Sequence, residues 1–274
     1  MGGTLYVVGT PIGNLGDMTD RARETLRTVD LVAAEDTRRT GRLLKAFGIR
    51  AKLLSLFEGN ERERTERVLS ILREGKDVAL VSDAGMPGIS DPGYRLVRAC
   101  AEEGIPVVAV PGPSAVIAAL VVSGLPTDRW VFEGFLPRRA SERRARLRAL
   151  RHDPRTVVLF EAPQRVATLL RDVLVELGDR RAVLARELTK LHEQVVRGRV
   201  SEVLATLADH EPKGEVVLVL EGATEPPRPP IVELVAEARA LVEAGMRKRA
   251  AAAAVGRRHG VPANEIYEAL VRPG

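Results

Sequence analysis

Short apolar runs alternate with amphipathic stretches along most of this 274-residue chain. The runs LYVVG (5–9), DLVAAED (30–36), DVALVSD (77–83) and PVVAVPG (106–112) have the composition of buried strands. Between them apolar residues recur every three or four positions, as in RERTERVLSILREG (62–75), which predicts helices with one buried face. Strands that alternate with helices in this way predict an α/β domain with a largely parallel sheet.

A second set of strand and helix patterns follows a helix that we predict at about residues 114–123. We therefore predict two tandem α/β domains, over residues 1–112 and 113–223, with a cleft between them. The strands of the second set are expected near WVFEGF (130–135), TVVLFEA (156–162), RAVLAREL (181–188), EQVVRGRV (193–200) and EVVLVLEG (215–222).

The chain ends in a different pattern. Residues 224–230 form a proline-rich linker, which cannot continue a strand or a helix. Residues 231–274 predict three short helices, and a helix, a glycine-containing turn and a second helix are typical of a helix-turn-helix domain. Its basic middle helix favours binding of nucleic acid, although a small helical cap with a solvated basic face is the alternative. The cations are Arg247, Lys248, Arg249, Arg257 and Arg258.

The composition limits the class of protein. The longest apolar run, residues 114–125, is shorter than the roughly 20 residues of a membrane span, and the first residues lack the basic start of a signal peptide. We therefore expect a cytoplasmic protein without a membrane partner. Cys100 is the single cysteine, and the four histidines lack metal-ligand spacing, so we expect no structural metal. The net charge of +5 favours an anionic partner.

The glycines of the first strand-end loop do not predict a phosphate site. Gly9, Gly13 and Gly16 have the spacing of neither the dinucleotide-binding nor the P-loop fingerprint. Pro11 also removes a backbone N–H where such loops donate to an anion. We expect another small ligand, or none, at this strand end.

Four loops that follow apolar strands are rich in glycine and proline: residues 9–17, 33–41, 82–93 and 110–115. Loops at the carboxyl ends of parallel strands form the ligand crevice of an open α/β sheet, so we expect these loops to converge. They hold few cations, and this balance suits a ligand that carries positive charge. Their carboxylates are Asp17, Glu35, Asp36, Asp83 and Asp91.

Several long blocks of the chain also carry a resemblance to a known family. They are GTLYVVGTPIGNLGDMT (3–19), AEDTRRTGRLL (34–44), LVSDAGMPGISDPG (80–93), VPGPSA (110–115), FEGFLPR (132–138), LFEAPQR (159–165) and ARELTKLHEQ (185–194). Together they resemble the ribosomal RNA small subunit methyltransferase I family of the tetrapyrrole methylase superfamily. The resemblance implies an S-adenosyl-L-methionine-dependent enzyme that methylates the ribose 2′-hydroxyl of a cytidine in the decoding centre of 16S ribosomal RNA. It also implies a homodimer that acts on free RNA or on the small ribosomal subunit.

In the superfamily that the chain resembles, the cofactor lies in the cleft between the two α/β domains and is held largely by backbone groups. Carried over onto the matching motifs, the implied cofactor-binding residues are Pro11, Ile12, Asp83, Gly85, Met86, Ser114, Ala115, Phe160, Glu161, Ala162, Lys213, Gly214 and Glu215. A purely structural alternative for Asp83 is that it caps the next turn.

A ribose hydroxyl is a poor nucleophile, so a positioned base or a cation that stabilises the alkoxide should accelerate transfer by about 10²–10⁴-fold. The candidates are Glu35, Asp36, Glu187 and Lys190, which lie in loops expected to border the cleft. Each pair has an alternative. Glu35 and Asp36 suit the start of a helix, where acids are favoured, and Glu187 and Lys190 suit an exposed strand-loop face.

An arginine-rich segment, residues 137–155, holds eight arginines against Glu142 and Asp153. Guanidinium groups at this density favour recognition of RNA phosphates, and the predicted contacts are Arg138, Arg139, Arg143 and Arg144. The alternative is a solvated helix, because arginine dominates over lysine throughout this chain.

Two other functions compete with rRNA methylation. A tetrapyrrole-precursor methylase would share the fold and the cofactor but would leave the arginine segment and the basic tail unexplained. A non-catalytic RNA-binding protein of ribosome assembly would explain both, but it would not require the cleft loops.

Overall fold

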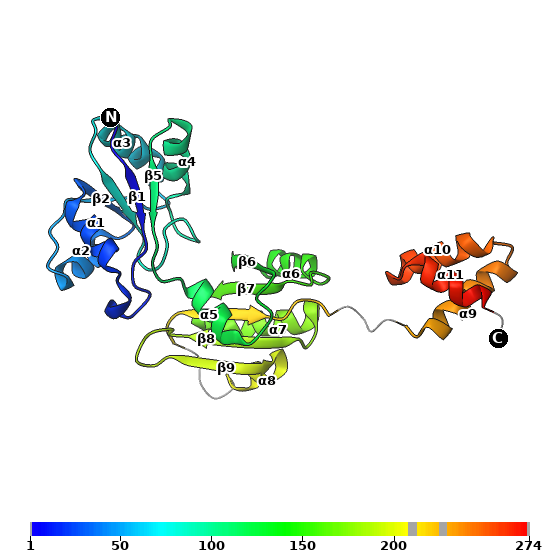
Figure 1. Ribbon diagram of the computed structural model, residues 1–274. Coiled ribbons are helices and arrows are strands. Elements are labelled where there is room, and N and C mark those ends of the chain that lie inside the picture. The colour runs from blue at the N-terminus through cyan, green and yellow to red at the C-terminus, as the bar shows by residue number, and fades with distance from the viewer. Residues whose placement is uncertain (1, 208–212, 225–228, 273–274) are drawn as a thin grey trace. The chain divides into compact units, whose positions relative to one another are not determined.

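The computed structural model describes residues 2–207, 213–224 and 229–272, which form two compact units, Met1–Gly222 and Ala223–Gly274 (Figure 1). The predicted α/β architecture and the C-terminal helical segment are confirmed. Residues 225–228 of the predicted linker and His210 lie outside the described residues. Among the helices that are described, none is both long and apolar enough to cross a membrane.

The first lobe of the larger unit is a five-stranded parallel sheet in the order β3-β2-β4-β1-β5. α1 and α2 cover one face of it and α3 and α4 the other (Figure 1), and their apolar side chains pack on the strands. Burial on both faces explains why the strands are almost continuously apolar. The elements are β1 (Leu5–Val8), a 3₁₀ turn (Leu15–Asp17), α1 (Asp20–Thr28), β2 (Leu31–Ala34), α2 (Thr37–Ala46), β3 (Leu53–Ser55), α3 (Glu61–Arg73), β4 (Val78–Val81), α4 (Tyr94–Glu102) and β5 (Val107–Val110).

The second lobe holds a mixed five-stranded sheet in the order β6-β7-β10-β8-β9. β6 and β7 are parallel, whereas β10 is antiparallel to both of its neighbours and β8 and β9 form an antiparallel pair. The elements are α5 (Ala115–Ser123), β6 (Trp130–Phe135), α6 (Ala140–Ala149), β7 (Thr156–Glu161), a 3₁₀ turn (Pro163–Arg165), α7 (Val166–Leu177), β8 (Arg181–Arg186), β9 (Gln194–Arg199), α8 (Val200–Ala205) and β10 (Val216–Leu220).

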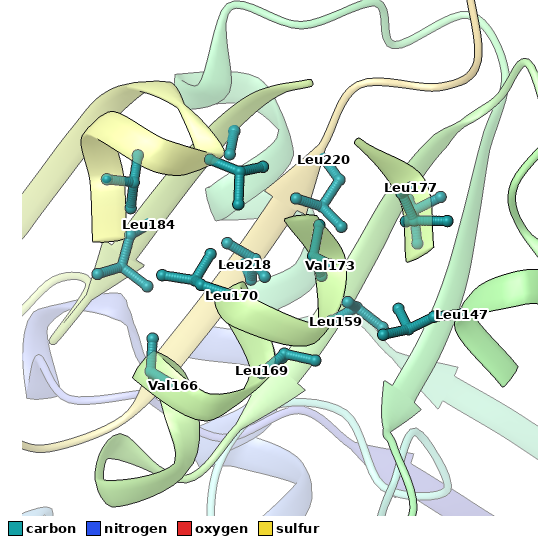
Figure 2. Packing of buried hydrophobic residues seen from close by; sticks show 14 of the residues in the cluster. Leu147, Leu159, Val166, Leu169, Leu170, Val173, Leu177, Leu184, Leu218 and Leu220 are labelled. Carbon is teal, nitrogen blue, oxygen red and sulfur yellow. The ribbon is translucent and has the colours of Figure 1, made fainter. Parts of the chain in front are cut away.

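The larger core of the second lobe lies between one face of this sheet and α6, α7 and α8 (Figure 2). α7 contributes a stripe at helical spacing, Val166, Leu169, Leu170, Val173 and Leu177, which packs against strand residues such as Leu159, Leu184 and Leu218. The alternate residues of β10, Val217 and Val219, pack on the opposite face with α5. β10 is therefore buried on both faces.

Ile12 connects the two lobes. It belongs to the loop after β1 but packs in the hydrophobic cluster of α5 and the second sheet, with Val116, Leu120 and Val217. The loops at the carboxyl edge of the first sheet are thus held against the second lobe.

The smaller unit consists of three helices, α9 (Ile231–Glu243), α10 (Lys248–His259) and α11 (Ala263–Val271). They enclose their own core, which includes Leu234, Ala252, Val255 and Ile266. α10 ends at Gly260, which has the left-handed conformation (φ +65°) that suits glycine. This arrangement agrees with the predicted helix, turn and helix.

Candidate functional site

The carboxyl ends of β1, β2, β4 and β5 lie at one edge of the first sheet because the strands are parallel. Two of the loops there touch through glycines: a Cβ built on Gly9 would lie 2.7 Å from Gly112 Cα and 2.7 Å from Met86 Sδ. The loop after β1 is also tied to the loop after β4, since Thr10 and Gly85 exchange backbone hydrogen bonds of 2.9 and 3.0 Å. Glycine is required at residues 9 and 112 for this close approach.

Three carboxylates, those of Glu35, Asp83 and Asp91, face the same space at this edge. Asp83 accepts the Asp36 backbone N–H at 3.1 Å and pairs with the Arg39 guanidinium at 3.1 Å. Its own backbone N–H donates to Glu35 Oε2 at 3.2 Å. These contacts join the ends of β2 and β4 and hold Asp83 in a fixed position.

Crowding and burial change the proton affinities of Glu35 and Asp91. Burial raises the pKa of Asp91 to about 6; a hydrogen bond with Ser82 opposes this shift, and the charges of Glu35 and Asp83 add to it. Burial also raises the pKa of Glu35, because the hydrogen bond from the Asp83 backbone offsets only part of the effect. A cation bound here would favour the ionised forms.

A cavity of about 360 Å³, the main cavity, opens between these loops and the second lobe. Most of the predicted cofactor-binding residues line it, together with Glu35, Arg39, Ile89, Ser90, Asp91 and Phe135. The predicted residues that line it are Ile12, Asp83, Gly85, Met86, Ser114, Ala115, Phe160, Glu161, Ala162, Gly214 and Glu215.

The second lobe supplies an aromatic wall and a buried acid to the main cavity. Phe160 on β7 packs edge-on against Phe132 (5.0 Å between ring centroids) and tilted against Phe135 (5.5 Å). Glu161, only 2% exposed, accepts from the Ala162 backbone N–H at 2.8 Å and from Arg165 Nη2 at 2.9 Å. Its charge is therefore compensated, and the backbone after β7 is held in place.

Two predicted cofactor contacts lie elsewhere. Pro11 lines a separate cavity of about 130 Å³, the second cavity, rather than the main one. Lys213 is exposed, and its carbonyl accepts from Arg186 Nη1 at 3.1 Å. Neither residue lines the main cavity, although their neighbours Ile12 and Gly214 do.

Lys190 and Glu187, two of the predicted catalytic residues, form one cluster at the edge of the main cavity. Lys190 Nζ lies 2.8 Å from Glu187 Oε1 and 3.3 Å from Oε2 of Glu215, which lines the main cavity. Burial lowers the pKa of Lys190, but its hydrogen bond to Glu187 and the charge of Glu215 outweigh burial, so the pKa is raised. The Lys190 side chain also packs on the first lobe: a Cβ built on Gly13 would lie 2.4 Å from Lys190 Cγ.

The loop that carries this cluster is strained. Glu187 and Thr189 both have the left-handed conformation, with φ of 51° and 67°, which residues other than glycine rarely adopt. The Glu187 carboxylate accepts the Glu215 backbone N–H at 2.9 Å, and Thr189 N–H donates to the Glu193 carboxylate at 2.6 Å. These hydrogen bonds stabilise the strained backbone. Strained backbone that its surroundings hold in place is often found at functional sites.

Asp36, another predicted catalytic residue, has a structural role. Its carboxylate accepts the Arg38 backbone N–H at 2.8 Å, caps α2 and pairs with the Arg38 guanidinium at 3.0 Å. The hydrogen bonds from Arg38 lower the pKa of Asp36 to about 2. Such a weak base is poorly suited to accept a proton at neutral pH.

The arginine-rich segment is largely paired with acids that lie outside it. Seven of its eight arginines have a carboxylate within 3.7 Å, from Glu133, Glu142, Asp153, Asp172 or Glu176. Arg143, predicted as a phosphate contact, is only 6% exposed and lies 2.6 Å from Asp172, so little of its surface is available to a phosphate. Arg144 pairs with Asp172 at 2.7 Å from the solvent side. Arg138 and Arg139 remain exposed.

The predicted basic residues of the helical unit lie on or just before α10. Arg247 precedes the helix, and Lys248, Arg249 and Arg257 are exposed on it. The Arg249 guanidinium lies 5.4 Å from the Tyr267 ring centroid, and Arg258 pairs with Glu237. Arg249 and Arg258 therefore also stabilise the packing of the three helices.

Sequence reasoning missed several residues of the main cavity, of which Arg39 and Phe135 matter most. Both lie in blocks that carried the family resemblance, AEDTRRTGRLL and FEGFLPR. Arg39 follows Glu35 by four residues at the start of a predicted helix, a spacing that could have suggested a nearby cation. Within the described residues no cluster of histidines, cysteines and acids has the arrangement of a metal site.

This fold and cavity define a class of protein. Residues 4–204 match the family model of Tetrapyrrole (Corrin/Porphyrin) Methylases. Among solved structures, uroporphyrin-III-C-methyltransferase from Thermus thermophilus is similar with a TM-score of 0.57, at 23% identity over 79% of this chain and 94% of that chain. Another structure of that enzyme, complexed with S-adenyl homocysteine, has a TM-score of 0.56 at 21% identity over 80% and 97%. Diphthine synthase is similar with a TM-score of 0.60, at 18% identity over 80% of this chain and 90% of that chain. The chain belongs to the family of Tetrapyrrole (Corrin/Porphyrin) Methylases and shares the fold of these structures.

Relatives with higher sequence identity point to one family within this class of methylases. Proteins named ribosomal RNA small subunit methyltransferase I are 48% identical in Synechocystis (97% of this chain, 96% of the relative) and 48% identical in Escherichia coli O157:H7 (97% and 94%). The chain belongs to the ribosomal RNA small subunit methyltransferase I family, as its motifs predicted. The Thermotoga maritima relative is 53% identical over 80% of this chain and 99% of its own length. The part of this chain that matches the Thermotoga maritima relative is about as long as the larger unit alone.

Proposed function

We propose that this protein transfers a methyl group to the ribose 2′-hydroxyl of a cytidine in 16S ribosomal RNA. Membership of its family makes the chain a methyltransferase, with S-adenosyl-L-methionine as its cofactor. The observation that carries the proposal is the similarity, over 97% of the chain, to relatives named as methyltransferases of small-subunit ribosomal RNA. The choice of ribose and of cytidine follows the family resemblance, as do a cytoplasmic homodimer and action on free RNA or the small subunit.

The main cavity fits this cofactor, which carries a sulfonium cation. Glu35, Asp83 and Asp91 line it, whereas Arg39 is the one lysine or arginine among its described lining residues. Phe135 and Phe160 add apolar surface for the uncharged part of a ligand. When bound, the cofactor supplies a methyl group on a positively charged sulfur, which the attacking oxygen displaces in line.

Lys190 is suited to stabilise the oxygen as it loses its proton. Its raised pKa keeps it protonated at neutral pH, so it acts as a cation and not as a base. Glu187 holds the ammonium group at 2.8 Å, and Glu215 connects it to the main cavity. A cation directed at a developing alkoxide accelerates such a reaction by about 10²–10³-fold.

Glu35 is the better of the two predicted bases in the first lobe. It lines the main cavity, and its raised pKa brings it closer to neutral pH, where a general base works best. Asp36 caps α2, and we assign it no role in proton transfer.

For RNA binding we propose contacts from the exposed arginines Arg138 and Arg139 and from Arg144, with the helical unit as a second surface. Arg247, Lys248 and Arg257 present their charge to solvent there. The excess of basic groups on both surfaces supports an anionic substrate.

The test is incubation of the purified protein with labelled S-adenosyl-L-methionine and small subunits that lack the modification, followed by mapping of the 2′-O-methyl group. We expect label on one cytidine of 16S ribosomal RNA. Lys190→Met should lower the rate about 10²-fold with little change in cofactor affinity, because it removes transition-state charge stabilisation. Lys52→Met, an exposed lysine of the first lobe, is the matched control and should keep the full rate.

Two outcomes would contradict the proposal. Methyl transfer to a tetrapyrrole precursor but not to ribosomal RNA would favour the first competing function. RNA binding without methyl transfer to any substrate would favour the second competing function, a non-catalytic RNA-binding protein. Separately, unchanged activity of Lys190→Met would show that Lys190 has no part in the mechanism.

A further inference from the structure

The second cavity, of about 130 Å³, shares a wall with the main cavity. Arg39 and Asp83, which form an ion pair of 3.1 Å, line both. The other residues that line the second cavity are Pro11, Gly13, Leu15 and Leu43, together with the polar residues Thr40 and Ser82. Leu15 is 50% exposed, so an apolar surface faces solvent beside a guanidinium group.

A basic helix face lies next to this cavity. α2 contains four cations and no acid, and it also supplies Arg39 and Leu43 to the second cavity. Arg38, Arg42 and Lys45 are spaced four and three residues apart, so they share one face of the helix. The Arg38 side chain is 85% exposed although it pairs with Asp36. Arg42 and Lys45 are exposed and have no carboxylate within 4.0 Å in the part of the chain that the structure describes.

The charge pattern distinguishes this face from the arginine-rich segment, whose arginines are mostly neutralised by carboxylates of β6 and α7. Cations that keep their charge exposed attract a polyanion. A guanidinium plane beside exposed apolar side chains is the kind of surface on which an unpaired base stacks.

We propose that α2 and the second cavity bind a single-stranded segment of the RNA substrate. Its phosphates lie along Arg38, Arg42 and Lys45, and one of its nucleotides enters the second cavity against Leu15, Leu43 and Arg39. This assignment rests on the proposed function and locates the strand that carries the target nucleotide.

The position of Lys190 supports this assignment. Its side chain packs on Gly13, which lines the second cavity, and its ammonium group contacts Glu215, which lines the main cavity. Lys190 therefore contacts one lining residue of each cavity. A nucleotide in the second cavity would be close, through Gly13, to the cation that we assign to the attacking oxygen.

The experiment measures binding of a single-stranded decoding-region RNA fragment to the full chain across a series of salt concentrations. In Arg42→Gln with Lys45→Gln, the slope of log affinity against log salt should flatten by about 1.4, which corresponds to two single-strand phosphate contacts. The matched control, Arg62→Gln with Arg67→Gln, removes two exposed cations from α3 on the opposite face of the same sheet and should leave the slope unchanged. Calorimetry should give the same cofactor affinity in all variants.

A second variant tests the second cavity without a change of charge. Leu15→Gln should weaken RNA binding at least about fivefold at constant salt slope, because it removes a stacking surface at an exposed position that the fold does not need. The proposal is overturned if the α2 variant has the slope of the α3 control, or if Leu15→Gln binds RNA as tightly as the wild type. Both results can occur with a wild-type protein that methylates small subunits normally. A wild type that fails to methylate them would instead refute the proposed function.

Discussion

Two regions of the larger unit, one in each lobe, use charge in opposite ways. Around α6 and α7 in the second lobe, arginines and carboxylates are mixed and neutralise each other, as in the Arg143–Asp172 pair. At the carboxyl edge of the first sheet the signs are separated, with Glu35, Asp83 and Asp91 lining the main cavity and Arg38, Arg42 and Lys45 of α2 exposed to solvent. Charges that are paired with each other contribute to the stability of the fold. Charges that are separated by sign can instead attract ligands of the opposite charge. The same residue types thus predict different functions according to their neighbours in the fold.

The largest effect should follow from breaking the most buried pair of the mixed region. Asp172→Asn leaves the Arg143 guanidinium buried without a counter-charge, so the free energy of unfolding should fall by about 3–5 kcal/mol. Urea denaturation of the wild type and the variant measures this difference. Glu142→Gln, which breaks only the exposed Arg139 pair, is the control and should cost less than about 1 kcal/mol. Equal stabilities of Asp172→Asn and wild type would mean that these arginines do not stabilise the second lobe.

A smaller effect, on binding and not on folding, should follow in the region of separated charges. Asp83→Asn should weaken binding of S-adenosyl-L-methionine at least about tenfold, because it removes a carboxylate that faces the main cavity and the partner of Arg39. Calorimetry checks this value, with the exposed Asp20→Asn as control. If the folded variant binds the cofactor with unchanged affinity, Asp83 has only a structural role between β2 and β4.

The smallest predicted effect is a dependence of cofactor affinity on pH. Burial raises the pKa of Asp91 to about 6, so this carboxyl group takes up a proton as the pH falls below that value and no longer attracts a cation. For binding that requires the ionised form, affinity should drop about fourfold between roughly pH 7 and pH 5.5. Calorimetry at several pH values should show this drop in the exposed control Asp128→Asn and a flatter profile in Asp91→Asn. Parallel profiles in both variants would assign the dependence to another group.

Much of the fold could be predicted from the sequence because its signals are local. The alternation of strands and helices follows from apolar spacing, and the strand-end loops follow from glycine and proline after buried strands. The converging loops 82–93 and 110–115 do line the main cavity, since parallel strands place their carboxyl ends together.

The parts that could not be predicted depend on contacts between distant residues. Residues 137–155 carry an excess of positive charge by themselves, but the compensating acids Glu133, Asp172 and Glu176 lie before and after them in the chain. The contact of Lys190 with Gly13 joins two lobes, and neither residue has a local signal for it. The left-handed backbone of Glu187 and Thr189 also depends on tertiary hydrogen bonds, since neither residue type favours that conformation.

The central position of β10 has a consequence for the order in which the chain can fold during its synthesis. β10 lies between β7 and β8 although it is the last strand of the sheet to be made. Until residues 216–220 have been synthesised, β7 and β8 each have an open edge, and β6–β7 and β8–β9 remain separate strand pairs. Glu215, directly before β10, and Val216 and Val217 of the strand line the main cavity. A nascent chain that ends before Glu215 therefore has two open strand edges prone to aggregation and an incomplete cavity. Insertion of β10 covers both edges and completes the cavity wall in one step.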